Sequence, residues 1–289
     1  MMRESIYINH LGGQGMSIEI SYLFIPANKE VMFSKALASG TDAIIIDLED
    51  AVHPNEKPLG RDNVLSWLHK INKSSVKTGI YIRINHPNDK EFDDDISLLN
   101  SLNNPLITGV MVPKLECSET INHLKSRLNA GISRLPFIGI IETARGLYHC
   151  ESIACSGVVR LAFGSLDYSH DINCLQTPEA LLYARSRIVV ASRLANLPPP
   201  IDCVTPEFCT SETLLTDCCH ARSLGFGAKL CIHPDQINVV AKAFSPTEEQ
   251  IKWAEEVLKQ SRDNYAFQVG GSMVDLPLIK QAVRLMNSK

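Results

Sequence analysis

A chain of 289 residues, of which 45% are hydrophobic and 21% charged, has the composition of a globular protein that stays in water, and it is long enough to bury the core of one large domain. Its net charge of −4, with Lys and Arg scattered among acids, offers no basic surface for nucleic acid, and no apolar run approaches the ~20 residues of a membrane helix. The nine cysteines form no C-x-x-C pair, which argues against a disulfide framework or zinc ribbon and favours reduced thiols in a cytoplasm.

Residues 1–19 precede the patterned part of the chain. They lack the apolar run and the small-residue cleavage site of a secretory signal. We expect this N-terminal extension to be disordered.

From residue 20 onward, short apolar runs rich in β-branched residues alternate with longer amphipathic stretches. This alternation is typical of βα units and a parallel sheet. The eight runs are SYLFIPA (21–27), DAIIIDLE (42–49), TGIYIRIN (78–85), ITGVMVPK (107–114), LPFIGIIE (135–142), VVRLAFGS (158–165), PPIDCV (199–204) and AKLCIHP (228–234).

Each run is followed by a stretch with helical spacing, and several of these stretches open with Ser, Asp, Thr or Pro and close near Gly or Asn, as capped helices do. Eight strands, each followed by a helix, predict an α/β fold, the closed (β/α)₈ TIM barrel, over residues 20–244. A doubly wound open sheet is the alternative. Its Gly-rich fingerprint is missing, because the first strand ends in IPANKE.

Residues 245–289 extend beyond a complete barrel. SPTEEQIKWAEEVLKQSRDN has the pattern of a capped helix, and GGSMVDLPLIKQAVRLMNSK predicts a second helix behind a glycine hinge at 270–271. We therefore expect a C-terminal helical extension that serves as a lid or as an oligomer contact.

Polar residues follow most of the predicted strands at the point where each strand ends. In a TIM barrel these ends form the face that carries the active site. The residues in question are Asp47, Glu49, Asp50, Arg83, Asn85, Lys114, Glu142, Asp167 and His233.

Glu142 and Asp167 stand at equivalent positions after adjacent strands. Neighbouring parallel strands lie about 4.8 Å apart, so the two carboxylates can converge, and they then need a cation or a shared proton. Because no Cys or His accompanies them, the oxygen ligands favour Mg²⁺. The alternative is that each pairs with a base such as Arg145 or caps the following helix.

Arg83 is a charged residue within an otherwise apolar strand, where an unpaired charge is costly. It can face a substrate anion, or it can form a structural salt bridge to Glu49 or Asp50. His233 can serve as a ligand, a base or a helix cap.

Ten segments in chain order resemble the citrate lyase beta-subunit-like branch of the HpcH/HpaI aldolase superfamily. Each segment alone is weak evidence, but ten in order along one chain are specific. They are YLFIPANKE, DAIIIDLEDAVHPNEK, YIRIN, VMVPKLE, GIIETARG, AFGSLD, LYARSRIVVASRLA, GAKLCIHPDQI, AFSPTEEQIKWAEEVL and GGSMVDLPLIKQA.

The resemblance implies a (β/α)₈ barrel, trimeric or hexameric, that binds Mg²⁺ and cleaves or forms a carbon–carbon bond in a CoA thioester. It implies that Glu142 and Asp167 hold the metal and that Arg83 contacts the substrate. The layer behind these residues is formed by Asp47, Glu49 and Asp50.

The tail is the most selective part of the resemblance. GGSMVDLP is similar to a segment of malyl-CoA, β-methylmalyl-CoA and citramalyl-CoA lyases in which a neighbouring subunit's lid supplies an acid, and the matching residue is Asp275. Without the resemblance, Asp275 is equally well explained as a helix cap. Val31 replaces a lysine of the relatives. Positions that match contacts with CoA or substrate are Phe24, Lys35, Gly164, Leu166, Ile232 and His233.

The reaction we expect on this resemblance is cleavage of a β-hydroxyacyl-CoA, with (S)-citramalyl-CoA giving acetyl-CoA and pyruvate. Arg83 stabilises the enolate, and Asp275 delivers a proton to its carbon. Backbone N–H groups from Gly164 to Asp167 receive the substrate carboxylate.

Several other functions remain open. Malyl-CoA and β-methylmalyl-CoA are alternative substrates, and the chain can also be a citrate lyase beta subunit that acts on a citryl thioester, although the tail argues against this. An aldolase of free keto acids and a binding barrel without catalysis are the remaining alternatives. The retained set of Arg83, Glu142, Asp167 and Asp275 argues against the last of these.

Overall fold

The computed structural model describes residues 19–71, 76–102, 106–207, 211–261 and 266–287. They divide into two compact units, one formed by Glu19–Ser245 and the other containing the residues from Pro246 onward. The extension predicted over residues 1–19 lies, except for Glu19, outside the described residues.

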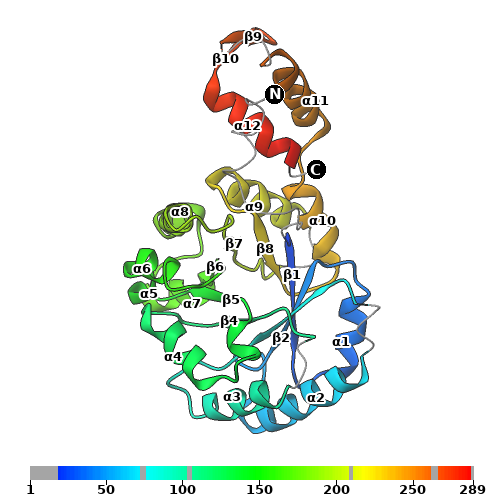
Figure 1. The fold of residues 1–289 in the computed structure, drawn as a ribbon, viewed down its shortest axis with the longest axis vertical. Helices are drawn as coiled ribbons and strands as arrows, with labels where there is room; N and C mark the ends of the chain where they lie inside the picture. The colour runs from blue at the N-terminus through cyan, green and yellow to red at the C-terminus, as the bar shows by residue number, and fades with distance from the viewer. Residues whose placement is uncertain (1–18, 72–75, 103–105, 208–210, 262–265, 288–289) are drawn as a thin grey trace. The chain divides into compact units, whose positions relative to one another are not determined.

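The first unit is a closed barrel of eight parallel strands in chain order, which closes where the eighth strand pairs with the first (Figure 1). This confirms the predicted (β/α)₈ fold, and every strand lies within its predicted apolar run. The strands are β1 Ser21–Pro26, β2 Ala43–Asp47, β3 Gly79–Arg83, β4 Gly109–Val112, β5 Phe137–Ile141, β6 Arg160–Phe163, β7 Ile201–Asp202 and β8 Ala228–Cys231.

Apolar side chains cover both faces of these strands. Ile45 and Tyr81 belong to a cluster of inward-facing residues that fills the barrel. Their neighbours Ile44 and Ile82 belong to a larger cluster between the strands and the helices. Because a closed parallel barrel is buried on both faces, its strands are continuous apolar runs rather than alternating ones.

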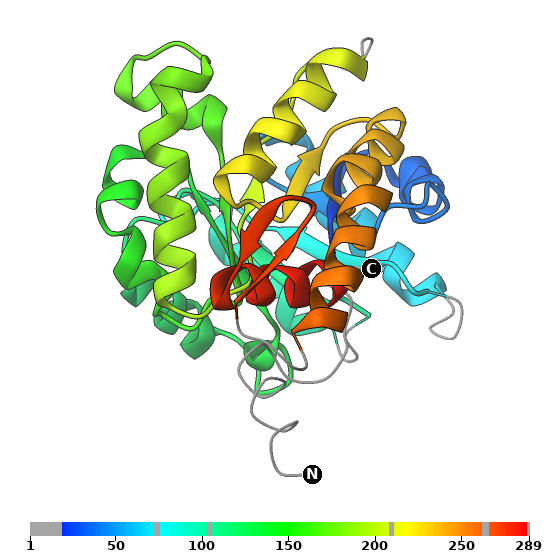
Figure 2. The ribbon, with the colours of Figure 1, turned by 90° about the horizontal axis from the view of Figure 1, so that it is seen from above.

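Helices surround the strands of this unit, as Figure 2 shows from above. They are α1 Glu30–Leu37, α2 Lys57–Lys70, α3 Phe92–Ser101, α4 Glu119–Arg127, α5 Ala144–Tyr148, α6 Cys150–Ala154, α7 Ser165–Ile172, α8 Pro178–Leu194, α9 Ser211–Leu224 and α10 Asp235–Phe244, with the 3₁₀ turns η1 Pro54–Glu56 and η3 Ile132–Arg134.

Two details of the helical layer differ from the prediction. One helix was expected after the fifth strand, but the chain forms two short helices there, α5 and α6, which meet at His149. Helix α7 was not predicted, because it is a second helix between β6 and β7, where the repeat of strand and helix predicts only one, α8. It ends at Asn173, which has the left-handed φ of 55° that Asn tolerates.

A buried group of charges anchors the two-residue strand β7. Asp202 pairs with Lys229 of β8 at 3.0 Å and with Arg185 of α8 at 3.0 Å, and all three side chains are at least nine-tenths buried. The two cations lower the pKa of Asp202 against the effect of its burial, which by itself would raise it. Since a buried charge is tolerated only when it is paired, this group fixes β7 between its neighbours and α8.

The second unit packs two helices and a β-hairpin around its own apolar core, which includes Ala254, Val257, Val274 and Ile279. A capping box of Thr247 and Gln250 starts the first helix. The elements are α11 Glu248–Gln260, β9 Phe267–Val269, β10 Ser272–Val274 and α12 Leu276–Asn287.

The predicted glycine hinge has a different local structure from the one expected. Gly270 and Gly271 form the two-residue turn between β9 and β10, with φ of 57° and 83°. Positive φ at both central positions is the requirement of a tight hairpin turn, which glycine meets without strain. The hairpin was not predicted, because β9 and β10 lie outside the repeat of apolar runs that marks the barrel strands. A lid movement of this unit stays a prediction.

Candidate active site

The carboxyl ends of the barrel strands form a mouth that is rich in charge. Arg83, Lys114 and Glu142 lie at or directly after the ends of β3, β4 and β5, and the contacts described below connect them. Among the described residues of the mouth, acids outnumber bases: Arg83 and Lys114 stand against the carboxylates of Asp47, Glu49, Asp50, Glu142 and Asp167.

Arg83 is held by two carboxylates from the end of β2. Its Nε and Nη2 donate to the two carboxylate oxygens of Asp47 at 2.7 and 2.6 Å, and its Nη1 lies 2.9 Å from Glu49 Oε2. The guanidinium carbon also lies 4.8 Å from the centre of the Phe24 ring. The salt bridge to Glu49, which was one of the two predicted alternatives, is therefore present, and it fixes the guanidinium at the mouth.

Asp47 is itself bound to the backbone. Its carboxylate accepts from the N–H groups of Glu49 and Ala51 at 2.9 and 3.1 Å. Burial raises the pKa of Asp47, but the charge and hydrogen bonds of Arg83 outweigh that effect and hold this pKa below its usual range. Asp47 is thus an ionised support for Arg83 and is fully buried.

Lys114 connects three of the mouth's carboxylates. Its ammonium donates to Glu49 Oε1 at 2.5 Å and to Asp50 Oδ2 at 3.3 Å, and its backbone N–H donates to Glu142 Oε1 at 2.7 Å. These neighbouring acids raise the pKa of Lys114 although its partial burial lowers it, so the side chain stays charged.

Glu142 is buried at the end of β5, and one of its oxygens is free of hydrogen bonds to the described residues. Oε1 is taken by Lys114, whereas Oε2 is directed toward Gly164. Burial, and next the charge of Glu49, raise the pKa of Glu142 to about 8. The charge of Asp167 adds to this rise, and the convergence of the two carboxylates on one cation stays a prediction.

The alternative predicted for Glu142, a pairing with Arg145, is not present among the described residues. Arg145 Nε lies 3.8 Å from Glu116 rather than against Glu142, and Thr143 caps α5. Asp167 lies in the first turn of α7 and is half-buried.

Gly164 gives Glu142 the space that it occupies. A Cβ atom at Gly164 would lie 2.6 Å from Cβ and 3.1 Å from Cδ of Glu142, closer than packed side chains allow. The N–H of Gly164 donates to Ile141 O at 3.1 Å. It is therefore not available for a substrate carboxylate, and the prediction that it binds one is wrong. The first-turn N–H groups of α7 at Leu166 and Asp167 remain for that purpose.

Gly164→Ala is expected to displace the Glu142 carboxylate and to weaken Mg²⁺ binding by about 10- to 100-fold. Isothermal titration of Mg²⁺ measures this. Gly131→Ala is the matched control, because a Cβ at Gly131 meets no atom within 4 Å. Wild-type Mg²⁺ affinity in Gly164→Ala would show that Glu142 does not need this space.

The remaining predicted contact residues lie on three other elements. Phe24 is half-buried beside Arg83, and Lys35 is exposed on α1. The N–H groups of Ile232 and His233 donate to Gln236 Oε1 at 2.8 and 3.3 Å, which fixes the turn before α10.

Two further polar residues named in the sequence analysis, Asn85 and Asp275, have other surroundings than the charged residues of the mouth. Asn85, which also follows β3, is fully buried and donates to Asp95 and to Leu48 O, away from the carboxylates of Glu49 and Glu142. Asp275 lies in the second unit, directly before α12, where its backbone carbonyl accepts from Ile279 N at 3.0 Å. Its side chain is exposed and forms no hydrogen bond or ion pair with the described residues.

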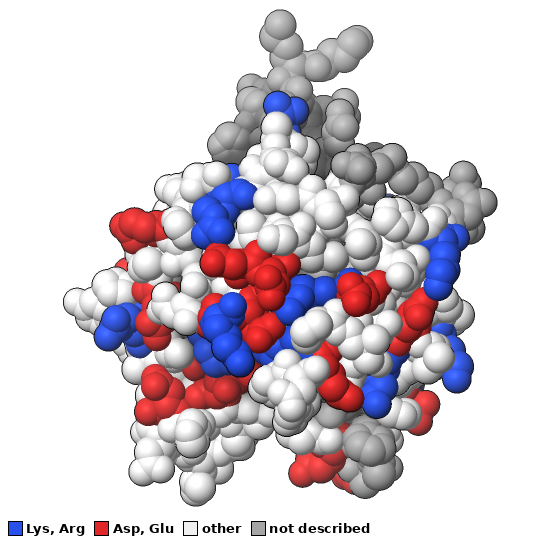
Figure 3. All heavy atoms as spheres, turned by 90° about the horizontal axis from the view of Figure 1, so that it is seen from below, with Lys and Arg blue, Asp and Glu red and all other residues white. Residues whose placement is uncertain are grey.

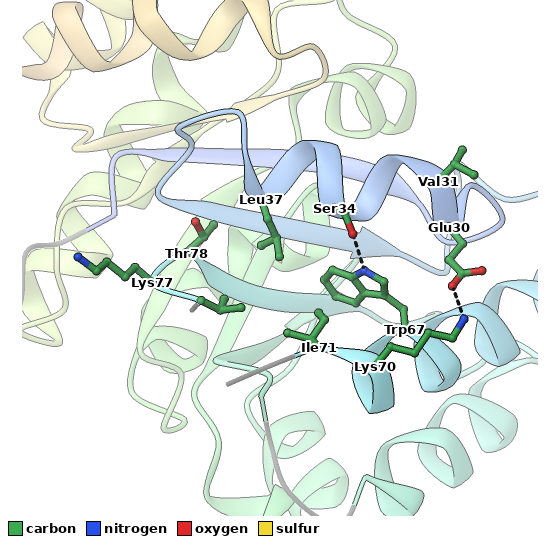
Figure 4. Close-up of a pocket in the computed structure, with 10 residues that line it drawn as sticks. Glu30, Val31, Ser34, Leu37, Trp67, Lys70, Ile71, Lys77 and Thr78 are labelled. Atoms are coloured by element: carbon green, nitrogen blue, oxygen red, sulfur yellow. Dashed lines mark hydrogen bonds and ion pairs between the residues drawn. The ribbon is translucent and has the colours of Figure 1, made fainter. Parts of the chain in front are cut away.

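Charged side chains of both signs lie next to one another in the middle of the face shown in Figure 3. A separate groove of about 640 Å³ lies between α1, α2 and the segment before β3 (Figure 4). It is lined by Val31 and by the pairs Glu30–Lys70 and Ser34–Trp67, and none of the mouth's charged residues lines it.

Among the described helices, none is both long and apolar enough to cross a membrane.

Lys114 is a functional candidate whose position at the strand ends was predicted, but for which no role was predicted. Its place after a strand put it at the mouth, but the pattern gave no sign of its left-handed φ of 46° or of its contacts with Glu49 and Glu142. The sequence PK after an apolar run was the available signal.

A closed (β/α)₈ barrel with this polar mouth defines a barrel enzyme. The family described as HpcH/HpaI aldolase/citrate lyase matches residues 21–234, and the chain belongs to that family.

Two relatives are similar in sequence to this chain over nearly its whole length. A citrate lyase subunit beta-like protein of Deinococcus radiodurans is 32% identical over 92% of this chain and 96% of its own length. The mitochondrial citramalyl-CoA lyase of Homo sapiens is 32% identical over 91% of this chain and 82% of its own. These relatives are named for carbon–carbon lyase reactions, and the expected class of enzyme is confirmed.

The fold has a solved counterpart. The protein CitE of Mycobacterium tuberculosis, in a crystal structure with magnesium, acetoacetate and coenzyme A, superposes with a TM-score of 0.80. The two chains are 28% identical, and the match covers 93% of this chain and 98% of CitE.

Proposed function

We propose that the chain is an Mg²⁺-dependent lyase that cleaves a β-hydroxyacyl-CoA, with (S)-citramalyl-CoA giving acetyl-CoA and pyruvate. The observation that carries the proposal is the buried carboxylate of Glu142, whose Oε2 has no hydrogen bond to the described residues, at the same end of the barrel as an arginine that two carboxylates fix. Asp167, in the first turn of α7, is the second acid of the proposed metal site. The citramalyl-CoA lyase among the relatives and the magnesium and coenzyme A bound to CitE support it.

The donor set fits Mg²⁺. Glu142 Oε2 and the Asp167 carboxylate are hard oxygen donors, and the excess of acids at the mouth favours a divalent cation. Among the described residues no group of three or more His, Cys, Asp or Glu forms a metal site. Two carboxylates suit Mg²⁺, which keeps several waters and takes its other ligands from substrate. When bound, the ion supplies Lewis-acid polarisation of the substrate's oxygens.

The chain's own residues perform the rest of the proposed reaction. The first-turn N–H groups of α7 at Leu166 and Asp167 receive the substrate carboxylate. As the carbon–carbon bond breaks, the substrate's hydroxyl group gives its proton to a water molecule and becomes the keto oxygen, and Arg83 stabilises the negative charge that develops on the thioester oxygen. The exposed carboxyl group of Asp275 then delivers a proton to the enolate carbon.

CoA contacts and assembly are proposed on the resemblance of the sequence to the family. We assign contacts with CoA to Phe24, Lys35, Ile232 and His233, and we propose a cytoplasmic homotrimer or hexamer. In this assembly the C-terminal unit of one subunit brings Asp275 to the mouth of its neighbour. A closed lid would exclude water there.

A substrate comparison tests the proposal. Purified protein with Mg²⁺ is incubated separately with citramalyl-CoA, malyl-CoA, β-methylmalyl-CoA and citryl-CoA, and the keto acid released is identified by mass spectrometry. We expect pyruvate from citramalyl-CoA at the highest kcat/KM. Preferred release of glyoxylate or oxaloacetate would assign the malyl or citryl reaction instead, and no cleavage of any thioester would overturn the proposal.

Mg²⁺ binding is expected to strengthen as pH rises. Because burial raises the pKa of Glu142 to about 8, the metal-free protein carries a proton there at pH 6 to 7 that must leave before the ion binds. Titration calorimetry should show affinity rising by up to about tenfold per pH unit below 8 and levelling above it. A flat profile between pH 6 and 8 would remove Glu142 from the metal site.

The same proton on Glu142 should make the metal-free protein less stable as pH rises, whereas Mg²⁺ binding strengthens. In the unfolded chain Glu142 ionises near its ordinary pKa of 4.5, whereas the folded metal-free protein holds the proton until about pH 8. The contribution of this group to stability is therefore lost as pH rises through that window. Accordingly, the increase in Tm that Mg²⁺ produces should be larger at pH 8 than at pH 6.

A further inference from the structure

Lys114 has a backbone conformation that is unusual for its residue type. Among the described residues, those other than glycine with positive φ are Lys114, Asn173 and Asn196. Asparagine tolerates the left-handed region, whereas for lysine it crowds Cβ against the following carbonyl. A lysine held there, at the mouth of the barrel, is a strained residue at a candidate functional site.

The left-handed backbone directs one N–H group at Glu142. The Lys114 N–H donates to Glu142 Oε1 at 2.7 Å, and the next N–H, that of Leu115, returns to Ile140 O of β5 at 3.0 Å. The carboxylate is thereby fixed by one oxygen. Its other oxygen, Oε2, is directed toward Gly164 and the start of α7.

The side chain of Lys114 contacts a different carboxylate. Its ammonium lies 2.5 Å from Glu49 Oε1, and the other oxygen of Glu49 lies 2.9 Å from Arg83 Nη1. Glu49 is buried and lies between two cations that come from neighbouring strand ends. Without the ammonium, Glu49 would retain only the ion pair with Arg83, and the position of Arg83 would change with it.

We propose that Lys114 is a positioning residue with two separable parts. Its left-handed backbone presents Glu142 for metal binding, and its ammonium holds Glu49 so that Arg83 keeps its place. The inference rests on the proposed metal site. It adds a residue outside the metal ligands and the substrate contacts.

A purely structural ion pair would not need this backbone. A lysine in an ordinary conformation can bridge two acids, and glycine can adopt the left-handed turn without steric cost. Lys114 combines both features at one position. Substitutions that remove one feature and keep the other therefore separate the two parts.

The backbone part is tested by Lys114→Gly and Lys114→Val. Both remove the ammonium, but only the β-branched valine excludes the left-handed conformation. By calorimetry we expect Mg²⁺ affinity within about threefold of wild type for the glycine variant. For the valine variant we expect affinity about 10- to 100-fold weaker. Equal Mg²⁺ affinity in the two variants would overturn the backbone part.

A second comparison serves if Lys114→Val does not fold. Lys114→Met keeps the strained backbone without the ammonium, so Lys114→Gly should melt at the same or a higher temperature than Lys114→Met. A lower melting temperature for the glycine variant would show that the left-handed conformation is not a strain on the native protein, and would also overturn the backbone part.

The ammonium part is tested by the kinetics of Lys114→Met. We expect kcat to fall by about 10- to 100-fold as Arg83 shifts, because small misplacements of a catalytic group cost about that much. Mg²⁺ affinity should stay near that of wild type. The control is Lys70→Met, which removes an exposed lysine paired with Glu30 at 3.1 Å, and should leave kcat unchanged. A lowered Tm with unchanged kcat in Lys114→Met would show that the ammonium is only structural.

These outcomes are separate from the test of the proposed function. If the wild-type protein cleaves no thioester, the proposed function fails, but the comparison of Mg²⁺ affinity between the glycine and valine variants still tests the positioning of Glu142. If the wild-type protein is active and both Lys114 parts fail, only the inference about Lys114 is withdrawn.

Discussion

Glu142→Gln is expected to remove Mg²⁺-dependent cleavage almost completely. The substitution replaces a buried charged ligand by a neutral amide of the same shape, so the space beside Gly164 stays filled while the charge that attracts the cation is lost. Lewis-acid polarisation contributes several kcal/mol, and its loss corresponds to about 10³-fold or more in kcat/KM. Initial rates of thioester cleavage over a range of Mg²⁺ concentrations measure this.

A buried carboxylate outside the mouth provides the control. Asp95 is fully buried and pairs with Arg61 at 3.1 Å, so Asp95→Asn should lower Tm but leave the Mg²⁺ dependence of the rate unchanged. Wild-type Mg²⁺ dependence in Glu142→Gln would show that the metal site lies elsewhere.

Asp275→Asn is expected to reduce kcat by about 10²- to 10⁴-fold, the range that a general acid contributes. The side chain is exposed and forms no hydrogen bond or ion pair with the described residues, so its replacement should leave Tm and Mg²⁺ affinity unchanged. Glu249→Gln, an exposed acid in the first turn of α11, is the control in the same unit. A fully active Asp275→Asn would remove this residue from the proposed reaction.

Mixing two inactive variants tests whether Asp275 acts across a subunit boundary. Glu142→Gln has an intact Asp275, and Asp275→Asn has an intact metal pair. If the acid comes from a neighbour, unfolding and refolding the two together should restore activity in part, because some mouths then combine a sound metal pair with a sound acid. No recovery in verified mixed oligomers would place Asp275 at the mouth of its own chain, or outside the reaction.

The barrel could be predicted because its evidence is periodic. Eight apolar runs that alternate with helical stretches are typical of one fold, the closed (β/α)₈ barrel. Each strand is visible as an apolar run because both of its faces are buried. Elements outside this repeat carry no such signal. Helix α7 is a second helix between β6 and β7, and the strands β9 and β10 follow the last unit of the barrel.

The residues of the mouth were predicted from their positions, but their pairings were not. Strand ends placed Arg83 and Glu142 at one face, yet a sequence does not show that Arg83 is bound by both oxygens of Asp47. It also does not show that the amide of Gly164 is already taken by Ile141. Such contacts depend on side-chain direction and on the twist of the sheet, which a linear pattern does not record.

Cleavage of citramalyl-CoA in D₂O is the most direct test of the proposed chemistry. The thioester product is analysed by mass spectrometry, with Mg²⁺ and with EDTA. We predict acetyl-CoA that carries one deuterium in its methyl group, together with an equal amount of pyruvate, and only when Mg²⁺ is present. Free CoA and citramalate, which are the products of thioester hydrolysis, or unchanged citramalyl-CoA would contradict the account.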